Sequence, residues 1–460
     1  MSSAVKLKNK KEIDMLNGPI LPGLFKFALP ILLSGILQQF YSTADTLVVG
    51  AMGGKEALAA VGATGSTVSL LVTVFASIFV GTNILVARAK GTGDELELKR
   101  IVSTTYIMSL SIGLFITIVG VFFSRTLLEW TDCPSHIIDD STRYLQIYFL
   151  GMIPSMFTNF AASVIRSSGN SRSPFIYLSI SGLTNVVSNV IFVLILGNPV
   201  TAVALATLLS MVVGAVLFAI HLIRDKSATG LRPFKLDFHY TIFIKTIKYG
   251  IPAAISSSCF ALTNFIIQPT LNSYGDVGIS GSAASTSIEA YIYVITASLS
   301  AAVSTFIGQN IGAGNKARVK EVIVKSYIIG VTVMALFSVV VLSMGRILLG
   351  FFIPGEVEAI EFGYLRMQMI VGVAAVNAVM NINGGTLQAY GYTFVQMLSN
   401  LIGVCFFRVM WMWFIYPLDP SPFNFLICYP VTWIITALTL FVAVILLTKK
   451  YLKGEKDFKI

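Results

Sequence analysis

The chain is poor in charge. Only 12% of its 460 residues are charged, whereas 55% are hydrophobic, and its mean hydropathy is +0.81. Soluble domains carry roughly 25% charged residues, so a large soluble domain is excluded. Apolar stretches of about 20 residues, long enough to cross a hydrocarbon core, recur along the whole chain. The composition indicates a polytopic membrane protein.

Residues that perform chemistry are also scarce, with 3 histidines and 4 cysteines in the whole chain. The histidines have no partner at metal-ligand spacing, and neither do the cysteines. No nucleophile–base set and no pair of aspartates inside a predicted span can be assembled. We therefore predict that the protein is not an enzyme and needs no cofactor.

The apolar runs predict an all-α protein with twelve transmembrane helices. The runs are continuous rather than alternating, which favours helices over a barrel. They span residues 24–49, 57–87, 101–123, 144–165, 175–197, 200–223, 241–272, 280–308, 323–346, 362–388, 394–416 and 424–448. The residues before the first run are polar and basic, and the run itself is too long for a signal peptide.

The net charge of +10 is unevenly distributed over the loops. Basic residues precede the first span, gather in alternate loops such as that with Arg224, Lys226, Arg232 and Lys235, and close the chain. The remaining loops carry mainly acids. By the positive-inside rule, both termini are predicted to be cytoplasmic. We expect a multi-pass protein of the cell's inner (plasma) membrane. The basic excess indicates membrane lipids as partners rather than nucleic acid.

The chain repeats itself after 222 residues. "FALPILLSG" at 27–35 is echoed by "YGIPAAISS" at 249–257, and "IRSSGNS" at 165–171 by "LQAYGYT" at 387–393. Each half holds six predicted spans, so both halves enter the membrane from the same side and enclose a cavity. We predict an N-terminal lobe (1–223), a cytoplasmic linker (224–242), and a C-terminal lobe (243–460) that ends in a basic cytoplasmic tail.

Two glycine loops also repeat, "GTGD" at 91–94 and "GAGN" at 312–315. Neither continues into the Lys-Ser/Thr of a phosphate-binding loop. We interpret them as tight turns whose glycines adopt a positive φ.

Polar residues follow one face of the first span at helical spacing: Ser34, Gln38, Tyr41, Ser42 and Asp45. Other spans add Asn159, Asn185, Ser188, Asn189, Asn264, Asn377 and Asn381. Such stripes line a wet cavity or join helices, and the amides and acids favour a cavity. Asp45 has no basic residue at its depth in the first half. It is either an exchangeable acid, since burial favours protonation, or a hydrogen-bonded structural group.

Two further ionisable residues, Glu289 and Arg408, lie at similar depth in the second half. Opposite charges inside a membrane normally pair, so we predict a mainly structural ion pair between them.

The chain resembles the multidrug and toxic compound extrusion family of secondary transporters over essentially its whole length. The resemblance rests on "GPILPGLFKFALPILLSGILQQFYSTADTLVVG", "ALAAVG", "RSSGNSRSPF", "SIEAYIYVITASLSAAVSTFIGQNIGAGN" and "LQAYGYT", in order. It implies a V-shaped pair of six-helix lobes, expected as a monomer, that exports small-molecule organic compounds, amphipathic and often cationic, by H⁺ or Na⁺ antiport. A flippase for a lipid or lipid-linked precursor is the alternative, although such a protein needs several arginines in its cavity.

The resemblance places the family's acidic residue of the first span at Asp45. The family's carboxylate in the fifth span is Asn189 here, and the acids of its second-lobe sodium site are lacking. Asp45 therefore carries one proton, or binds one Na⁺ with Asn185 and Asn189. We expect the substrate cavity to include Gln38, Tyr41, Ser42, Asn159, Ser188, Asn264, Glu289, Asn377, Asn381 and Arg408.

Overall fold

The computed structural model describes residues 12–233 and 235–454, and every regular element in these ranges is a helix. The described residues form two compact units: the first holds 12–18 and 29–248, and the second holds 19–28 and 249–454. The basic residues Lys6, Lys8, Lys10 and Lys11, which precede the first predicted span, and the end of the predicted basic tail lie outside the described residues.

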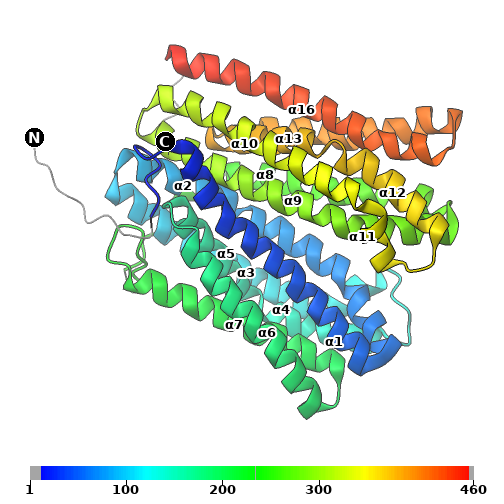
Figure 1. The fold of residues 1–460 in the computed structure, drawn as a ribbon. Helices are drawn as coiled ribbons and strands as arrows, with labels where there is room; N and C mark the ends of the chain where they lie inside the picture. The colour runs from blue at the N-terminus through cyan, green and yellow to red at the C-terminus, as the bar shows by residue number, and fades with distance from the viewer. Residues whose placement is uncertain (1–11, 234, 455–460) are drawn as a thin grey trace, which may run out of the picture. The chain divides into compact units, whose positions relative to one another are not determined.

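The helices up to the linker are α1 (Ile20–Ser77), α2 (Phe79–Thr92), α3 (Glu95–Glu129), α4 (Ile138–Leu150), α5 (Met152–Ser167), α6 (Arg172–Leu196) and α7 (Pro199–Arg224). The first unit contains all of these except residues 20–28 of α1, together with residues 240–248 of α8 (Tyr240–Asn272). Within this unit α6 packs against α7, and α3 packs against α4 and α5 (Figure 1).

The second unit contains the rest of α8, then α9 (Gly275–Gly312), α10 (Lys316–Ser343), α11 (Gly345–Phe352), α12 (Val357–Val371), α13 (Ala374–Ala389), α14 (Thr393–Asn400), the π-helical η1 (Leu401–Phe406), α15 (Phe407–Met410), the π-helical η2 (Trp411–Ile415), the 3₁₀ turn η3 (Tyr416–Leu418) and α16 (Pro422–Lys453). Here α9 packs against α12 and α13, and α13 against α16.

The predicted all-α fold with twelve spans is confirmed. Nine helices in the described residues are long and apolar enough to cross a membrane, or eleven if each bent pair counts as one span. The first of these stretches, Ile20–Thr92, also contains a non-helical residue, Gly54, at φ 71° and ψ −168°. Dividing it there brings the count to twelve, six to each unit.

Two of the predicted spans are bent. The α4–α5 pair turns by 45° at Gly151, and the α12–α13 pair turns by 43° after Val371. Pro154 lies in the first turn of α5 and has no N–H to donate to the carbonyl of Leu150, so the helical ladder cannot run unbroken from α4 into α5. The two bends occupy equivalent places in the two halves, so the repeat extends to the irregularities of the backbone.

The predicted glycine turns are confirmed. Gly93 and Gly314 have φ values of 75° and 68°, a region that glycine enters without steric cost. The residue after each glycine caps the next helix. The Asp94 side chain accepts hydrogen bonds from the backbone N–H groups of Leu96 and Glu97, and Asn315 accepts one from Arg318.

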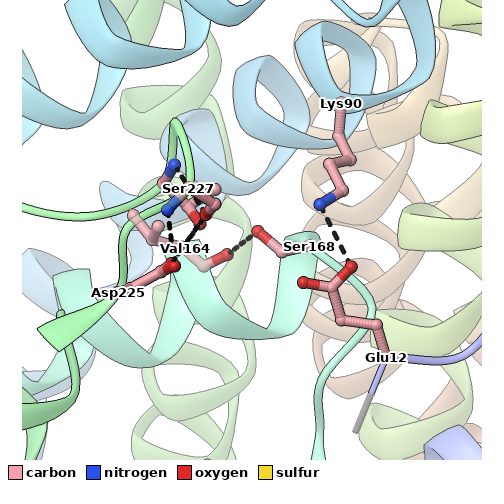
Figure 2. A network of polar contacts seen from close by, with 7 residues as sticks. Glu12, Lys90, Val164, Ser168, Asp225 and Ser227 are labelled. Atoms are coloured by element: carbon pink, nitrogen blue, oxygen red, sulfur yellow. Dashed lines mark hydrogen bonds and ion pairs between the residues drawn. The ribbon is translucent and has the colours of Figure 1, made fainter. Parts of the chain in front are cut away.

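The segment before α1 is docked on the first unit. Figure 2 shows the ion pair between Glu12 Oε2 and Lys90 Nζ, which are 3.1 Å apart. The backbone N–H of Ile13 donates to Gly169 O at 3.0 Å. Gly169 has φ +100°, and a Cβ at this residue would lie 3.1 Å from Ile13 O. The turn between α5 and α6 therefore requires glycine for two reasons, its φ and this close approach.

The orientation of the chain in the membrane is a first prediction. We expect Ser135→Cys, between α3 and α4, to react with a membrane-impermeant thiol reagent in intact cells, and Lys235→Cys, after α7, to react only after permeabilisation. Both side chains are exposed, and the positive-inside rule places the basic loop in the cytoplasm. Both variants carry Cys133→Ser, which removes the partly exposed native cysteine. The other three cysteines are buried and should not react. Labelling of both positions from the same side would contradict the topology.

Candidate functional site

The first unit encloses a cavity of about 530 Å³ beside Asp45. Helix α1 supplies Gln38, Tyr41, Ser42 and Asp45 to its wall. These residues recur at spacings of three and four, so the helical period alone puts them on one face. Further lining residues come from the rest of α1 and from α4, α6 and α7. The polar face predicted for the first span is thus the wall of a cavity.

Asp45 begins a chain of polar side chains that crosses three helices. Asn189 on α6 donates through Nδ2 to Asp45 Oδ1 and also to Asn185 Oδ1 at 3.3 Å. Asn185 Nδ2 in turn donates to Thr207 Oγ1 on α7 at 3.3 Å. All of these partners are neutral, so the carboxylate is oriented without being neutralised. Asn189 Oδ1 is buried and has no partner among the described residues.

Three tyrosines stand around the same cavity. Tyr144 and Tyr148 lie one turn apart on α4, with stacked rings 6.2 Å apart. Tyr41 donates to Ser179 O at 3.2 Å, and its ring lies directly against Gly182 on α6. Among the lining residues Asp45 is the one with a charge. The cavity therefore combines one negative group with aromatic walls.

The remaining predicted cavity residues of the first unit lie outside this wall. Asn159 donates to Ser155 O in its own helix, at 3.0 Å, and Ser188 is buried, with 7% of its surface exposed. Asn189 contacts Asp45 but is not part of the lining. The structure brings together Gln38, Tyr41, Ser42, Asp45 and Asn185, with Asn189 behind them.

The predicted ion pair between Glu289 and Arg408 is wrong. Glu289 on α9 is bound by Arg366 on α12, through Nε–Oε1 at 2.8 Å and Nη2–Oε2 at 3.0 Å. Ser285 Oγ adds a hydrogen bond to Oε1 at 2.7 Å. Glu289 is 1% exposed, so this is a fully buried ion pair. It lies in the core of the second unit.

Close packing of two helices explains why Arg366 rather than Arg408 reaches Glu289. A Cβ on Gly281 would lie 2.4 Å from Ala359 O, and a Cβ on Gly363 would lie 2.7 Å from Gly281 O. Helices α9 and α12 thus meet backbone to backbone, which brings Arg366, one turn beyond Gly363, alongside Glu289. Sequence reasoning omitted Arg366 although it lies inside the tenth predicted span.

Arg408 lies over the ring of Tyr429, the same ring that Arg366 contacts. Its Cζ is 4.3 Å from the ring centroid of Tyr429, while Arg366 Cζ is 5.1 Å from the same centroid. Arg408 Nη2 donates to Thr432 Oγ1 at 3.2 Å, and Arg408 forms no ion pair with any described residue. The Tyr429 ring therefore stabilises the Arg408 guanidinium, for which the sequence had predicted the Glu289 carboxylate as the partner.

The other predicted residues of the second unit lie separately. Asn381 Nδ2 donates to Asn377 Oδ1 at 2.9 Å on α13, and Asn264 is exposed on α8. Sequence reasoning also missed Tyr144, Tyr148 and Thr207. The four-residue spacing of the two tyrosines was an available signal, since it places both rings on one helical face.

Our second prediction concerns the contact of Tyr41 with Gly182. A Cβ at residue 182 would lie 1.7 Å from Tyr41 Cε2, so Gly182→Ala must displace the ring into the cavity. Overpacking of this kind typically costs about 1–3 kcal/mol, and we expect a lower midpoint of thermal unfolding. Gly62→Ala is the matched control, because Gly62 lines the same cavity with no atom within 4 Å of the added methyl group. Equal midpoints for the two variants would refute the assigned contact.

A third prediction replaces the ion pair of the second unit. Glu289→Gln or Arg366→Met leaves one buried charge without its partner, which typically costs about 3–5 kcal/mol. We expect each to lower the yield of folded protein, measured by size-exclusion chromatography, and the double variant to recover most of it. Arg408→Met should spare the yield, because it leaves the pair intact. If Glu289→Gln folds normally but does not transport, the pair serves transport rather than stability.

Comparison with known proteins shows which family the chain resembles. The MatE family profile matches residues 30–191 and again 252–414, which is the repeat read from the sequence. "Probable multidrug resistance protein YpnP" of Bacillus subtilis is 26% identical over 395 residues, covering 85% of this chain and 87% of the relative. "Probable multidrug resistance protein YoeA" of the same organism is 29% identical over 307 residues, or 65% of this chain and 66% of the relative.

The fold has a close counterpart among solved structures. A crystal structure of MATE in the bent conformation superimposes with a TM-score of 0.90 at 18% identity, covering 97% of this chain and 99% of that one. Twelve helices in two lobes of six are the architecture of such proteins. On these grounds the chain is a multi-pass plasma-membrane protein and belongs to the multidrug and toxic compound extrusion (MatE) family of transporters.

Proposed function

We propose that this protein is a secondary active antiporter that exports amphipathic, often cationic, drugs or toxic compounds in exchange for H⁺ or Na⁺. One observation carries the proposal: a single carboxylate, Asp45, is the charged group in the wall of a cavity that is otherwise neutral. The names of the relatives, which refer to multidrug resistance, support the same class of substrate.

The chemistry of the cavity suits an organic cation. Aromatic faces attract cations through the negative charge of the π-system, and Tyr41, Tyr144 and Tyr148 all contribute to the wall. Leu58, Val61 and Val68 supply apolar surface for the rest of an amphipathic molecule. Because few of these contacts are directional, the cavity can accept compounds of different shape, as a multidrug transporter must.

In the proposed coupling, the ion and the substrate compete for the same group, Asp45. An ionised Asp45 attracts a cationic substrate, and a proton or a sodium ion that neutralises it removes the attraction. A ligand shifts the transport cycle only through its different affinities for the two states. A sodium ion would also take oxygen ligands, and the unpartnered Asn189 Oδ1 and the nearby Asn185 supply such atoms.

A flippase for a lipid or lipid-linked precursor is the second candidate. Such a protein must hold a phosphate or pyrophosphate, for which paired arginines are the natural ligands. The buried arginines of the second unit are Arg366 and Arg408, and Glu289 already binds the first. The Asp45 cavity contains no basic residue. The observations therefore favour an exporter of cations.

The same proposal includes the lobes and the topology. It takes 1–223 and 243–460 as the two lobes of a monomer, joined by a cytoplasmic linker at 224–242, with both termini in the cytoplasm. The second-unit residues proposed to contact substrate during the cycle are Asn264, Glu289, Asn377, Asn381 and Arg408. Glu289, Asn377 and Arg408 are buried in this structure, so their contact with substrate requires another conformation of the second unit.

The fourth prediction tests Asp45 directly. In proteoliposomes loaded with a fluorescent amphipathic cation, we expect Asp45→Asn to reduce gradient-driven transport to background, because the amide keeps the size of the side chain but cannot exchange a charge. Proton and sodium gradients are imposed separately, and the gradient that drives the wild-type protein identifies the coupling ion. Ser42→Ala, on the same wall, is the matched control and should retain most of the activity.

Folding is checked independently of transport. Asp45→Asn protein should elute as a single species and insert as the wild-type protein does. Strong gradient-driven export by Asp45→Asn would overturn the proposal, and the exchange site would then have to be sought at Glu289.

A further inference from the structure

A second cavity lies at the end of α7, separate from the Asp45 site. It has a volume of about 470 Å³ and is lined by Tyr177 on α6 and by Leu217, Ile220, His221, Arg224, Asp225 and Lys226 at the end of α7 and in the loop after it. It shares no lining residue with the Asp45 cavity. Pockets of this size hold small organic ligands or headgroups.

The cavity lies at the depth of the lipid headgroups. Helix α7 is an apolar span that ends at Arg224, so the residues around Arg224 lie where the hydrocarbon meets water. Beside the cavity, Ile176 and Ile180 on α6 are 40% and 42% exposed, and Ile220 and Ile223 on α7 are 42% and 48% exposed. In a membrane these side chains face acyl chains. The apolar surface thus continues up to Arg224, Asp225 and Lys226, which form the charged rim of the cavity.

The polar floor of the cavity is held in place by packing. Tyr177 Oη and His221 Nδ1 are hydrogen-bonded at 2.8 Å. The Tyr177 ring meets the fully buried Phe218 edge-on, with the centroids 5.2 Å apart. A tyrosine at this depth is typical of the membrane interface, where its apolar ring and its hydroxyl face different environments.

The loop that carries the rim is equally ordered. The Asp225 carboxylate accepts hydrogen bonds from Ser227 N at 2.9 Å, from Ser227 Oγ at 2.8 Å and from Thr229 Oγ1 at 2.6 Å (Figure 2 shows Asp225 with Ser227). Burial opposes its ionisation, but the bonds from Thr229 and Ser227 outweigh that effect and hold the pKa of Asp225 below its usual range. Leu231 N then donates back to Leu222 O on α7 at 2.9 Å.

The charges at the rim are not balanced. Asp225 contributes one negative charge, which interacts with His221. Arg224 and Lys226, on either side of it, are exposed and form no ion pair with any described residue. Arg224 and Lys226 thus offer N–H donors at the edge of a cavity whose walls include the apolar Leu217 and Ile220. The ligand that satisfies both features is an anion carrying an apolar tail.

We propose that this cavity binds the phosphate headgroup of an anionic phospholipid, with Arg224 and Lys226 on the phosphate, Tyr177 and His221 at its base, and an acyl chain along Ile220. Basic pockets between membrane helices are a recognised setting for such lipids. Free phosphate shares the headgroup's chemistry but would make no use of the apolar surface. The site does not depend on the transport role of Asp45, and binding is measured without a gradient or a substrate.

Native mass spectrometry of the full chain in neutral detergent tests the proposal, with phosphatidylglycerol and phosphatidylcholine of identical acyl chains as probes. We expect the wild-type protein to retain phosphatidylglycerol in preference. Each basic residue near an anionic headgroup contributes about 1 kcal/mol, so Arg224→Gln/Lys226→Gln should lower the affinity for phosphatidylglycerol roughly thirtyfold. Ile220→Trp, which fills the cavity and keeps both charges, should also weaken binding.

Lys99→Gln/Arg100→Gln is the matched control, because it removes the same charge from exposed residues of α3 that are outside the cavity. Its affinity should equal that of the wild-type protein. The proposal is overturned if the control loses as much binding as Arg224→Gln/Lys226→Gln, because the attraction is then diffuse. It is also overturned if both lipids bind equally, or if excess inorganic phosphate alone displaces phosphatidylglycerol completely.

Discussion

A carboxylate inside a membrane span must find its hydrogen-bond partners within the protein, because hydrocarbon offers none. Asp45 meets this requirement through Asn189, and Asn189 is aligned by Asn185, which in turn is bonded to Thr207. The chain of contacts fixes α1, α6 and α7 against one another. Because these partners are neutral, Asp45 keeps a charge that it can lose, which the proposed exchange needs.

The acidic residue inside the membrane has a different environment in each of the two units. In the first, Asp45 is half-buried at a cavity wall with amides around it. In the second, Glu289 is enclosed and bound through both oxygens by Arg366. Neutralising Glu289 would leave Arg366 as a buried charge without its counter-ion, at a cost of several kcal/mol. Duplication has therefore preserved the helical framework while the two halves have acquired different electrostatics.

The framework itself depends on backbone features that recur in both halves. Gly93 and Gly314 make equivalent turns of positive φ before capped helices. The bends at Gly151 and after Val371 are also equivalent. Close approaches at single glycines then decide local contacts, as where α9 meets α12 at Gly281 and Gly363, or where Tyr41 lies on Gly182. These backbone features determine which side chains meet, whereas the apolar spans alone do not specify such contacts.

The sequence alone predicted the apolar runs, the repeat and the polar face of α1. These features depend on the length of hydrophobic segments and on the helical period, which are properties of neighbouring residues along the chain. The sequence by itself thus determined the all-α fold, the number of spans, the glycine turns and the place of Asp45 on a polar face. Only the tertiary structure decided which helix faces which. Depth in the membrane made Arg408 look like the partner of Glu289, but depth does not specify the neighbouring helix, and the glycine contact of α9 with α12 selected Arg366. The tyrosine wall around Asp45 likewise required α4 to be placed beside α1, a contact between residues about a hundred positions apart that no local pattern encodes.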